Sequence, residues 1–474
     1  MAETATRRRT RGGGRAGAAA RRGAAVIEQM PWNPPVITDA PTEPLSPEGV
    51  AAIHDGAMRI LEEIGIQFLN EEALGILREA GCTIDGDIVR MDRDFVMEMV
   101  GKAPSQFTLT PRNPNRKLTV GGRHLLFGNV SSPPNYWDME IGTKVPGTRE
   151  MCANLLKLTQ YFNCIHFAGG YPVEPVDLHA SVRQLDVLFD INSTSPLKHD
   201  QPMIDGWLRM IRRGQAVVVT PFTLAGAMAP VTMAGAVAQS IAEALCAIAL
   251  FQYVAPGAPC AIGTFTSNVD MKSGAPAFGT PEYMRATQMT GQLARFYGLP
   301  MRSSGVCAAN VPDGQASWET SNSLWAAVQS GSNMVYHAAG WLEGGLIASP
   351  EKFIMDCEIL QQIQRYMEPA IVGSGPDDTA LDAGKSVGNE GHFFGIQHTQ
   401  DRYSTAFYQP FLSDWKNYEG WDAAGAIWTP ERAHRMFKDI IGSFEAPPMD
   451  VAIREELADF VARRKAEGGA PTDF

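Results

Sequence analysis

The sequence contains no uninterrupted apolar run near the length that a membrane-spanning helix needs, which is about 18 residues. Its least polar stretch, residues 224–238, is interrupted by glycine and by Pro230. We therefore expect no membrane association. The composition also excludes a fibre or a largely disordered protein, because 45% of the 474 residues are hydrophobic and 19% are charged. Such a chain suits one large domain, or two modest ones, with a well-developed core.

Closely spaced cysteines are also missing. The seven cysteines lie far apart and none belongs to a CxxC pair, so neither a disulfide framework nor a tetrahedral zinc site is indicated. We expect reduced thiols in a cytoplasmic protein, and no bound metal. The cysteines are Cys82, Cys152, Cys164, Cys246, Cys260, Cys307 and Cys357.

Acidic residues are nearly absent from the first 25 residues, which contain seven arginines and one acid. Because the whole chain has a net charge of −12, about −18 remains for the rest. Residues 1–35 offer few side chains for a core, and we predict a disordered arginine-rich segment and linker. A polyanion contact or an organellar presequence is the alternative reading of this segment, but we expect no nucleic-acid partner.

Residues 36–122 mix helical and strand-like patterns. Ser46 and Pro47 predict the cap and first turn of a helix, and the apolar spacing in residues 70–81 predicts a second, shorter one. Asp85-Gly86 indicates a tight turn, and residues 105–122 are rich in residues favoured in strands. We predict a small N-terminal α+β layer that caps a larger domain.

Short apolar segments alternate with amphipathic helices over residues 123–400. This alternation indicates repeated βα units, and we predict an α/β fold, a TIM (β/α)8 barrel. A doubly wound sheet would alternate in the same way, but it usually carries a phosphate-binding glycine loop after an early strand, and this sequence has none. The predicted strands are residues 124–130, 164–170, 195–200, 216–226, 259–265, 301–306 and 333–340, with a less obvious eighth strand around 392–398. The predicted helices are residues 148–162, 178–190, 203–213, 235–254, 280–297, 316–330 and 350–367.

Residues 401–474 form a C-terminal extension that begins with many aromatic residues and ends with two predicted helices. We expect the extension to pack either over the barrel or over another subunit, and an exposed aromatic patch there would mark an interface. A homo-oligomer is the expected assembly.

Residues 271–305, which contain TPEYMRATQ, and residues 311–360, which contain YHAAGWLEGGLIASPEK, carry a family pattern. They closely resemble the trimethylamine/glycine betaine:corrinoid methyltransferase superfamily, and the similarity extends from the first helix to residue 410. The resemblance implies a TIM barrel that moves a methyl group from a methylated amine to Co(I) of a small corrinoid-binding protein. It implies no tightly bound cofactor, because the corrinoid belongs to the partner.

The founding branch of that family contains pyrrolysine, and this chain has none. A tertiary amine is a poor methyl donor unless its nitrogen is protonated or quaternised, which is the task that pyrrolysine chemistry is thought to assist. A quaternary ammonium leaves as a neutral amine, so it needs orientation and desolvation more than acid–base help. We therefore expect a betaine-like donor, with trimethylamine as the alternative.

A quaternary ammonium forms no N–H hydrogen bonds but is attracted to aromatic faces. Barrel active sites lie at the carboxyl ends of strands, so aromatic residues at predicted strand ends are candidate substrate-binding residues, although core packing is the alternative for each. Trp341 is the preferred cage wall because it directly follows a predicted strand. The other candidates are Tyr136, Trp137, Tyr171, Phe222, Phe265 and Tyr336, with Phe393 or Phe394 beyond.

Polar candidates accompany these rings. Glu343 offers a negative charge for the substrate cation, or caps the next helix, and His337 could hydrogen-bond the substrate or be a core histidine. These two are the candidate catalytic residues. Lys272 or Arg302 could pair with a betaine carboxylate, or form a salt bridge at the barrel rim. Further candidates are Asn268 and Asp270, after the fifth strand, and His392 and His398, which would share one side of a strand.

Two other function classes remain open. A non-catalytic quaternary-amine binding or regulatory protein would have the same cage, because binding and transfer need similar pockets. A lyase or hydrolase on the same barrel would require a metal cluster or a basic residue with an electrophilic partner, and the sequence shows neither convincingly.

Overall fold

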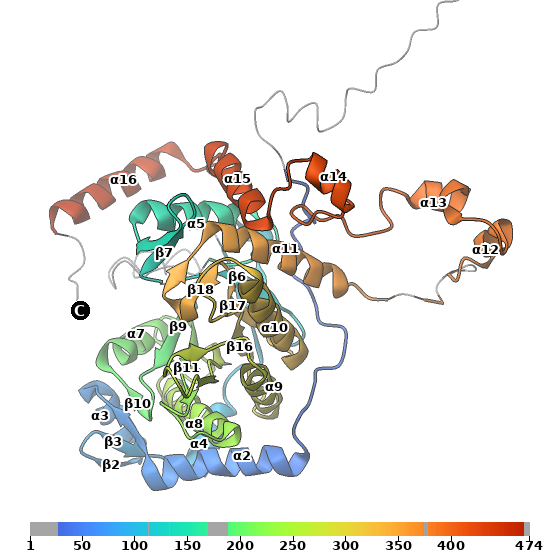
Figure 1. Cartoon of the computed structure of the whole chain (residues 1–474). Helices are drawn as coiled ribbons and strands as arrows, with labels where there is room; N and C mark the ends of the chain where they lie inside the picture. Colours follow the sequence, from blue (N-terminus) through green and yellow to red (C-terminus); the bar gives the residue numbers. More distant parts are fainter. Residues whose placement is uncertain are drawn as a thin grey trace, which may run out of the picture.

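The computed structural model describes residues 27–111, 113–131, 133–168, 188–370, 372–373, 375 and 378–468. A parallel β-sheet with surrounding helices forms the body. The N-terminal layer, in blue, and the C-terminal helices, in red, lie at opposite ends of that body in Figure 1.

The N-terminal layer forms where its local signals predict. Ser46 caps the first helix by accepting a hydrogen bond from the Gly49 N–H at 3.2 Å, and Pro47 occupies the first turn. The turn after Asp85 joins an antiparallel hairpin. The helical segments are α2 (Pro47–Arg59), the π-helical η1 (Ile60–Ile64), α3 (Glu71–Glu79), α4 (Arg93–Val100) and η2 (Pro114–Arg116). The strands are β1 (Ile66–Phe68), β2 (Thr83–Asp85), β3 (Ile88–Arg90), β4 (Gln106–Leu109) and β5 (Leu118–Gly121).

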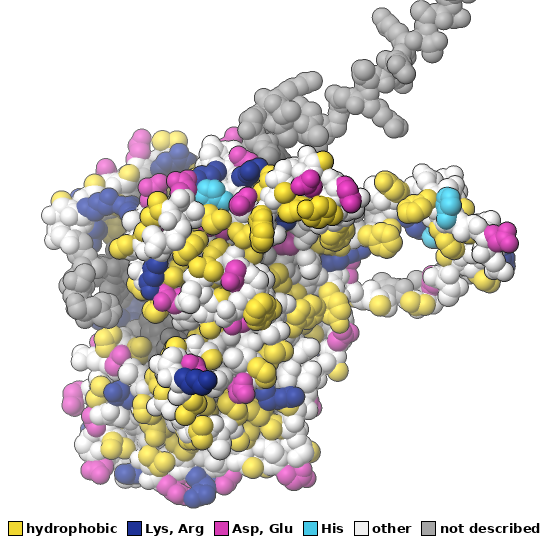
Figure 2. Space-filling view, in the orientation of Figure 1, with side chains coloured by type: hydrophobic (Ala, Val, Ile, Leu, Met, Phe, Trp, Pro, Cys, Tyr) yellow, Lys and Arg dark blue, Asp and Glu magenta, His cyan; other side chains and the backbone are white. Residues whose placement is uncertain are grey.

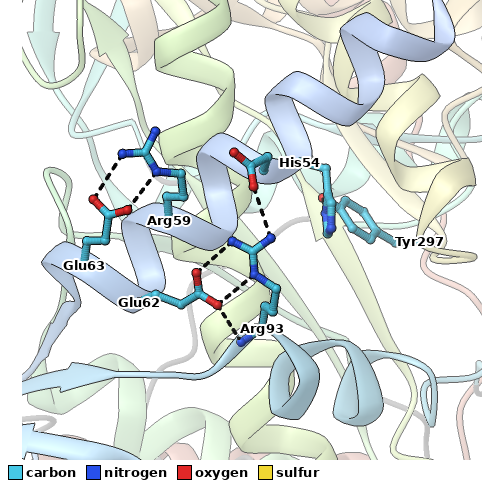
Figure 3. A network of polar contacts seen from close by, with 7 residues as sticks. His54, Arg59, Glu62, Glu63, Arg93 and Tyr297 are labelled. Atoms are coloured by element: carbon cyan, nitrogen blue, oxygen red, sulfur yellow. Dashed lines mark hydrogen bonds and ion pairs between the residues drawn. The ribbon is translucent and has the colours of Figure 1, made fainter.

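Charged side chains join the first helices of this layer, as Figure 3 shows. Arg93, at the start of α4, forms ion pairs with Glu62 at 2.8 Å and with Asp55 at 3.1 Å. His54 of α2 contacts the Tyr297 hydroxyl at 3.0 Å, at the end of a helix of the main body. Because the arginine is partly exposed, these pairs fix the geometry of the layer more than they stabilise it.

The central sheet has the strand order β6-β17-β16-β13-β11-β9, and every pair is parallel. The last strand in sequence, β17, therefore lies beside the first, β6, which is the cyclic order of a barrel. Phe167 adds a parallel bridge on the other side of β6. In the described residues, the ring of strands is not closed between Phe167 and β9. The strands are β6 (Leu126–Asn129), β9 (Leu188–Ser193), β11 (Ala216–Pro221), β13 (Cys260–Gly263), β16 (Met301–Ser304) and β17 (Met334–Ala339).

Two of the predicted barrel strands are wrong, and one predicted helix is partly wrong. Within residues 195–200, only β10 (Lys198–His199) is a strand, and it pairs with β1 of the N-terminal layer. Residues 392–398 form the 3-10 helix η4 (Phe393–Gly395) and the start of α13 (Gln397–Arg402). Of the predicted helix 178–190, residues 188–190 belong to β9, and the remainder lies outside the described residues. A short apolar run does not reveal its pairing partner, which explains the error at residues 195–200, and it does not distinguish a strand from a helix, which explains the error at residues 392–398.

Helices follow the strands and cover the sheet. The longest, α8, is apolar enough to cross a membrane, but 89% of its most apolar window is buried inside the body, as in a core helix. It packs against α2 and α4, and so joins the N-terminal layer to the sheet. These helices are α5 (Arg149–Tyr161), α7 (Gln201–Ile211), α8 (Met233–Val254), α9 (Pro281–Phe296), α10 (Gly314–Ser330) and α11 (Pro350–Tyr366).

A buried carboxylate fixes the chain where β9 ends. Glu243 of α8 accepts hydrogen bonds from the Ser193 hydroxyl, from the Ser195 hydroxyl at 2.5 Å and from the Leu197 N–H at 2.8 Å. Gln239, one turn earlier, donates to the same carboxylate at 2.9 Å. Burial raises the pKa of Glu243, and these donors oppose that rise. The carboxylate thus satisfies several polar groups that would otherwise be buried without partners.

Small strand pairs and the C-terminal helices complete the fold. At the carboxyl ends of the sheet lie two small sheets, in the orders β12-β14-β15 and β18-β19-β7-β8. Helix α15 packs along α11. The small strands are β7 (Asn135–Asp138), β8 (Thr143–Pro146), β12 (Leu224–Ala225), β14 (Ser267–Val269), β15 (Pro276–Ala277), β18 (Trp341–Leu342) and β19 (Ile347–Ala348). The remaining helices are η3 (Glu343–Gly345), α12 (Leu381–Val387), α14 (Tyr418–Ala423), α15 (Thr429–Gly442) and α16 (Val451–Ala466).

Buried histidines make the stability depend on pH. Burial lowers the pKa of His199 to about 4, and that of His337 well below its usual value. Both rings are neutral in the folded chain, whereas the unfolded chain binds these protons below about pH 6.5. The free energy of unfolding should therefore be highest above pH 6.5 and fall as the pH decreases, by up to about 1.4 kcal/mol per pH unit for each histidine. Urea unfolding at pH 7, 6 and 5 measures this slope.

A pair of variants assigns the slope to the buried rings. His199→Gln should reduce the pH dependence, whereas His392→Gln, at an exposed position, should leave it unchanged. The same slope in both variants would contradict the assignment.

Candidate functional site

A buried arginine of the central sheet lies between aromatic rings. Arg302, on β16, is 1% exposed. Its guanidinium lies 4.7 Å from the ring centroid of Tyr336 and 5.5 Å from that of Phe265, distances typical of cation–π contacts. It also donates to the Ser304 hydroxyl at 2.7 Å. Arg302 and Ser304 are two residues apart on one strand and so point to the same face of the sheet.

His337 is held beside this arginine by a strained backbone. Its φ is 54°, a left-handed value that is uncommon for residues other than glycine. The ring's Nε2 lies 3.4 Å from Arg302 Nη2, and its Nδ1 lies 3.4 Å from the Ser131 N–H. A neutral imidazole has one bare nitrogen, so one of these contacts is a hydrogen bond in either tautomer. Burial, and then the charge of Arg302, lower the pKa of His337, which keeps the ring neutral.

Trp341, Phe222 and Phe278 extend this group of rings toward the carboxyl ends of the strands. The Trp341 ring lies 4.2 Å from the His337 ring and 5.9 Å from the Phe265 ring. Phe265 is 5.2 Å from Phe222 and 5.3 Å from Phe278. The indole N–H of Trp341 is buried and has no hydrogen-bond partner among the described residues. An aromatic cluster thus contains a donor that a bound ligand could use. We call Arg302, His337, Trp341, Tyr336, Phe265 and Phe222 the ring cluster.

A buried ion pair supports the corner that carries Trp341. Lys352 and Asp356 pair within α11, and both side chains are almost fully buried. Lys352 also donates to the Thr320 hydroxyl at 2.8 Å, and Asp356 accepts from the Gly340 N–H at 2.8 Å. Because Gly340 directly precedes Trp341, this pair fixes the backbone from which the indole extends.

Glycines bring the chain close to the rings. A Cβ on Gly345 would meet the Trp341 ring at 2.5 Å, and one on Gly128 would meet the Phe167 ring at 2.2 Å. Phe167 in turn packs on Tyr336, with 4.8 Å between ring centroids. A side chain at position 345 would displace Trp341 of the ring cluster, and one at position 128 would displace Phe167, which packs on that cluster.

Glu343 and three other polar candidates lie outside the ring cluster. Glu343 forms an ion pair with Lys144 of β8 at 2.6 Å. Asn268 accepts from the Thr280 hydroxyl at 3.0 Å, next to the start of α9. Asp270 accepts from the Ser273 hydroxyl at 2.6 Å and from backbone N–H groups in an exposed turn, which also lower its pKa; the exposed Lys272 lies in the same turn.

Tyr136 and Trp137 lie on β7, in the sheet that also contains β18. Tyr136 lines a small cavity of about 80 Å³ together with Asn129, Ser131 and Met151. The Trp137 indole N–H is buried without a hydrogen-bond partner among the described residues. These two side chains therefore belong to the rim of the sheet rather than to the ring cluster.

The two remaining histidine candidates, His392 and His398, lie on the segment around η4 and α13. Phe393 and Phe394 are exposed on the same segment. The structure does not bring these residues to the ring cluster. Tyr171 lies outside the described residues. In the part of the chain that is described, no group of three His, Cys, Asp or Glu side chains could hold a metal ion.

Four residues of the site were missed by the reasoning from sequence. Ser304 holds Arg302, the Ser131 N–H approaches His337, Phe278 packs on Phe265, and Phe167 packs on Tyr336. Ser304 lies two residues after Arg302 on the same predicted strand, a signal that could have identified it. The other three come from distant loops and strand ends, and the sequence contains no signal that places them here.

The chain is similar to known methyltransferases. The family model for trimethylamine methyltransferase (MTTB) matches residues 11–191 and 188–469. The glycine betaine methyltransferase of Desulfitobacterium hafniense (strain Y51) is 32% identical, over 90% of this chain and 98% of the relative. The trimethylamine methyltransferase MttB of Desulfitobacterium hafniense (strain DSM 10664 / DCB-2) is 28% identical, over 90% of this chain and 94% of the relative.

The crystal structure of the monomethylamine methyltransferase MtmB of Methanosarcina barkeri superposes with a TM-score of 0.51 at 9% identity, over 90% of each chain. At this identity the likeness concerns the fold alone, and it supports a mixed α/β architecture.

The Lys352–Asp356 pair gives a stability test. Asp356→Ala leaves the Lys352 ammonium buried without its carboxylate, and should lower the free energy of unfolding by about 3–5 kcal/mol. The double variant Lys352→Met with Asp356→Leu removes both charges at similar volume and should stay much closer to the parent. Urea unfolding, followed by tryptophan fluorescence, measures both. Equal losses in the two variants would show that packing, not the pairing of charges, dominates here.

Proposed function

Because the chain belongs to the trimethylamine methyltransferase (MTTB) family and is a methylated-amine methyltransferase, we propose that its methyl donor is a betaine-like quaternary amine. The proposed acceptor is the Co(I) centre of a corrinoid-binding protein in the cytoplasm. The family match over most of the chain supports the reaction class, and the ring cluster supports the choice of donor.

Arg302 within the aromatic rings is the observation that carries this choice. A betaine has a cationic ammonium and an anionic carboxylate a few bonds apart. Ring faces such as those of Trp341 and Phe265 attract the ammonium, and the guanidinium can donate to the carboxylate. Neutral trimethylamine has neither a permanent positive charge nor a carboxylate, so the same groups recognise it less well.

His337 and the Trp341 N–H fit the same ligand. His337 is neutral, so it adds no positive charge that would repel an ammonium, and its ring packs against the Trp341 ring at an interplanar angle of 44°. The buried indole N–H is a second donor for a carboxylate oxygen. A ligand that satisfies this donor gains affinity, because a buried N–H without an acceptor is unfavourable.

Transfer from such a donor needs no proton. The C–N bond breaks, its electron pair stays on nitrogen, and a neutral tertiary amine leaves. The reduced cobalt of the partner protein supplies the electron pair that forms the new bond to the methyl group. The role of this chain is therefore to orient the C–N bond and to exclude water from it.

The proposed partner would bind at the carboxyl ends of the strands. We propose that the sheet is the wall of a TIM barrel whose mouth lies at the carboxyl ends of β13, β16 and β17, beside the ring cluster. The described loops on this side expose large apolar side chains, and an apolar rim suits a corrin ring and the protein that carries it. These residues are Ile141, Val231, Met271 and Leu346.

The reaction is tested with a panel of donors. The purified chain is mixed with free Co(I) cobalamin and with glycine betaine, proline betaine, carnitine, choline or trimethylamine, and methylcobalamin is followed by absorbance. Carboxylated quaternary amines should react at least about tenfold faster than choline or trimethylamine, because one hydrogen bond between the guanidinium and a carboxylate contributes enough free energy for that factor. Calorimetric binding of a betaine without methylation of cobalamin would instead favour a binding or regulatory protein.

Arg302→Met tests the carboxylate contact. The variant keeps much of the side-chain volume but loses the charged donor, which is worth about 1.5–3 kcal/mol in a hydrogen bond to a charged group. The KM for the preferred betaine should rise roughly 10- to 100-fold, while the slow rate with choline should hardly change. Arg302→Lys is the matched control. It keeps the charge, so its KM for the betaine should lie between those of the parent and of Arg302→Met. Equal losses for betaine and choline would assign Arg302 to the fold rather than to the substrate.

A further inference from the structure

A segment of the C-terminal region projects from the body with almost no core of its own. Residues 378–407, which we call the arm, contain α12, η4 and α13. Figure 1 shows the arm, in orange, extending beyond the end of α11. Ala383 is its one buried residue, all of the arm being described. Segments shorter than about 40 residues seldom fold without further support, so this conformation needs another surface.

The arm exposes aromatic rings instead of burying them. Phe394 is 74% exposed and Phe407 is 81% exposed, and Phe393 and Tyr403 are also exposed. Figure 2 shows hydrophobic side chains along the projecting arm. Single exposed apolar residues are ordinary on protein surfaces, but four aromatic rings on one projecting segment indicate an interface.

The polar contacts of the arm are local, whereas its base is firmly attached. Gln397 bonds to Asp401 at 2.6 Å, and Gln400 donates to the Phe394 carbonyl at 2.6 Å. Just beyond the arm, the buried Glu358 of α11 accepts from the Tyr408 hydroxyl at 2.9 Å and from the Leu412 N–H at 3.0 Å. The arm therefore starts from a fixed base, which sets its direction.

The position of the base separates the arm from the proposed mouth of the barrel. Helix α11 starts at Pro350, next to β19 at the carboxyl ends of the strands, and runs back to Tyr366 at the opposite end. In Figure 1 the arm continues beyond that end, away from β7 and β18. A corrinoid protein must approach the mouth, so the arm is badly placed to bind it.

A second copy of the chain offers the complementary surface. Large aromatic side chains flank the arm on both sides in the sequence, and all are exposed. In a dimer with a two-fold axis, the arm of each copy can cover this flanking surface of the other, because such interfaces are self-complementary. The flanking residues are Tyr366, Trp415, Tyr418 and Trp428.

We propose that the arm binds a second copy of this chain, with the two arms exchanged across a two-fold axis and their aromatic rings placed on the flanking surfaces. A stable interface takes roughly 20–30 residues from each partner. The arm alone supplies about that number, and the flanking surface adds to it. Two exchanged arms therefore suffice for a lasting dimer.

The test measures the mass of the full chain in solution. Sedimentation velocity at about micromolar concentration should show a dimer or a multiple of it for the parent chain. The double variant Phe394→Ser with Phe407→Ser should raise the dimer dissociation constant more than tenfold and shift the mass to the monomer. Trp318→Ser, which removes an exposed ring on α10, is the matched control and should leave the mass unchanged. A monomeric parent, or an arm variant with the parent's mass, would overturn the proposal.

A second double variant controls for misfolding of the first. Trp415→Ser with Trp428→Ser alters the flanking surface and leaves the arm intact, and should produce the same monomer. Hydrogen exchange of residues 382–406 in the parent chain should become faster when the protein is diluted. Protection that does not change on dilution would mean that the arm packs on its own chain. Loss of methyl transfer to a corrinoid protein at unchanged mass would assign the arm to that partner. Either result overturns the proposal.

Discussion

The parallel pairing of β17 with β6 is the contact on which both the fold and the ring cluster depend. It joins the last strand of the sheet to the first and so gives the strands their cyclic order. Val335 pairs with Phe127 and Ala339 with Asn129, so β17 carries two more residues than β6 over this stretch. His337 lies within this irregular stretch at a positive φ, beside Arg302. A regular ladder would point alternate side chains to alternate faces, and the bulge changes that alternation.

Buried charges hold the corners between strands and helices, and each is paired or hydrogen-bonded. Glu243 fixes the chain after β9, and Lys352 with Asp356 fixes the turn before Trp341. Such groups are unfavourable in a core unless every polar atom finds a partner, so they strongly restrict the backbone around them. Arg302 differs from them because its cation also rests on ring faces. The rigid corners and the cation between the rings together would preorganise a surface for the proposed zwitterionic donor.

The proposed substrate site and the proposed dimer interface lie at opposite ends of α11. One end of this helix supports the turn that carries Trp341, and the other continues toward the arm. In the proposed dimer, such a separation would let the proposed corrinoid protein reach the carboxyl ends of the strands while two chains remain joined through their arms. The ion pairs of Arg93 and the packing of α8 belong to a third region, where the N-terminal layer closes the body.

The sequence by itself determined the elements whose signals are local: the cap at Ser46, the hairpin at Asp85, and the strands of the central sheet and the helices of residues 216–366, but not the short segments β14, β15, β18, β19 and η3 between them. It also determined the family, and it named the six residues that the fold brings together as the ring cluster. Only the tertiary structure decided that residues 198–199 join the N-terminal sheet, that residues 392–398 are helical, and that Asp270 caps an exposed turn. Capping and periodicity act over a few residues, whereas strand partners and the contacts of Phe167, Ser131 and Phe278 depend on distant segments.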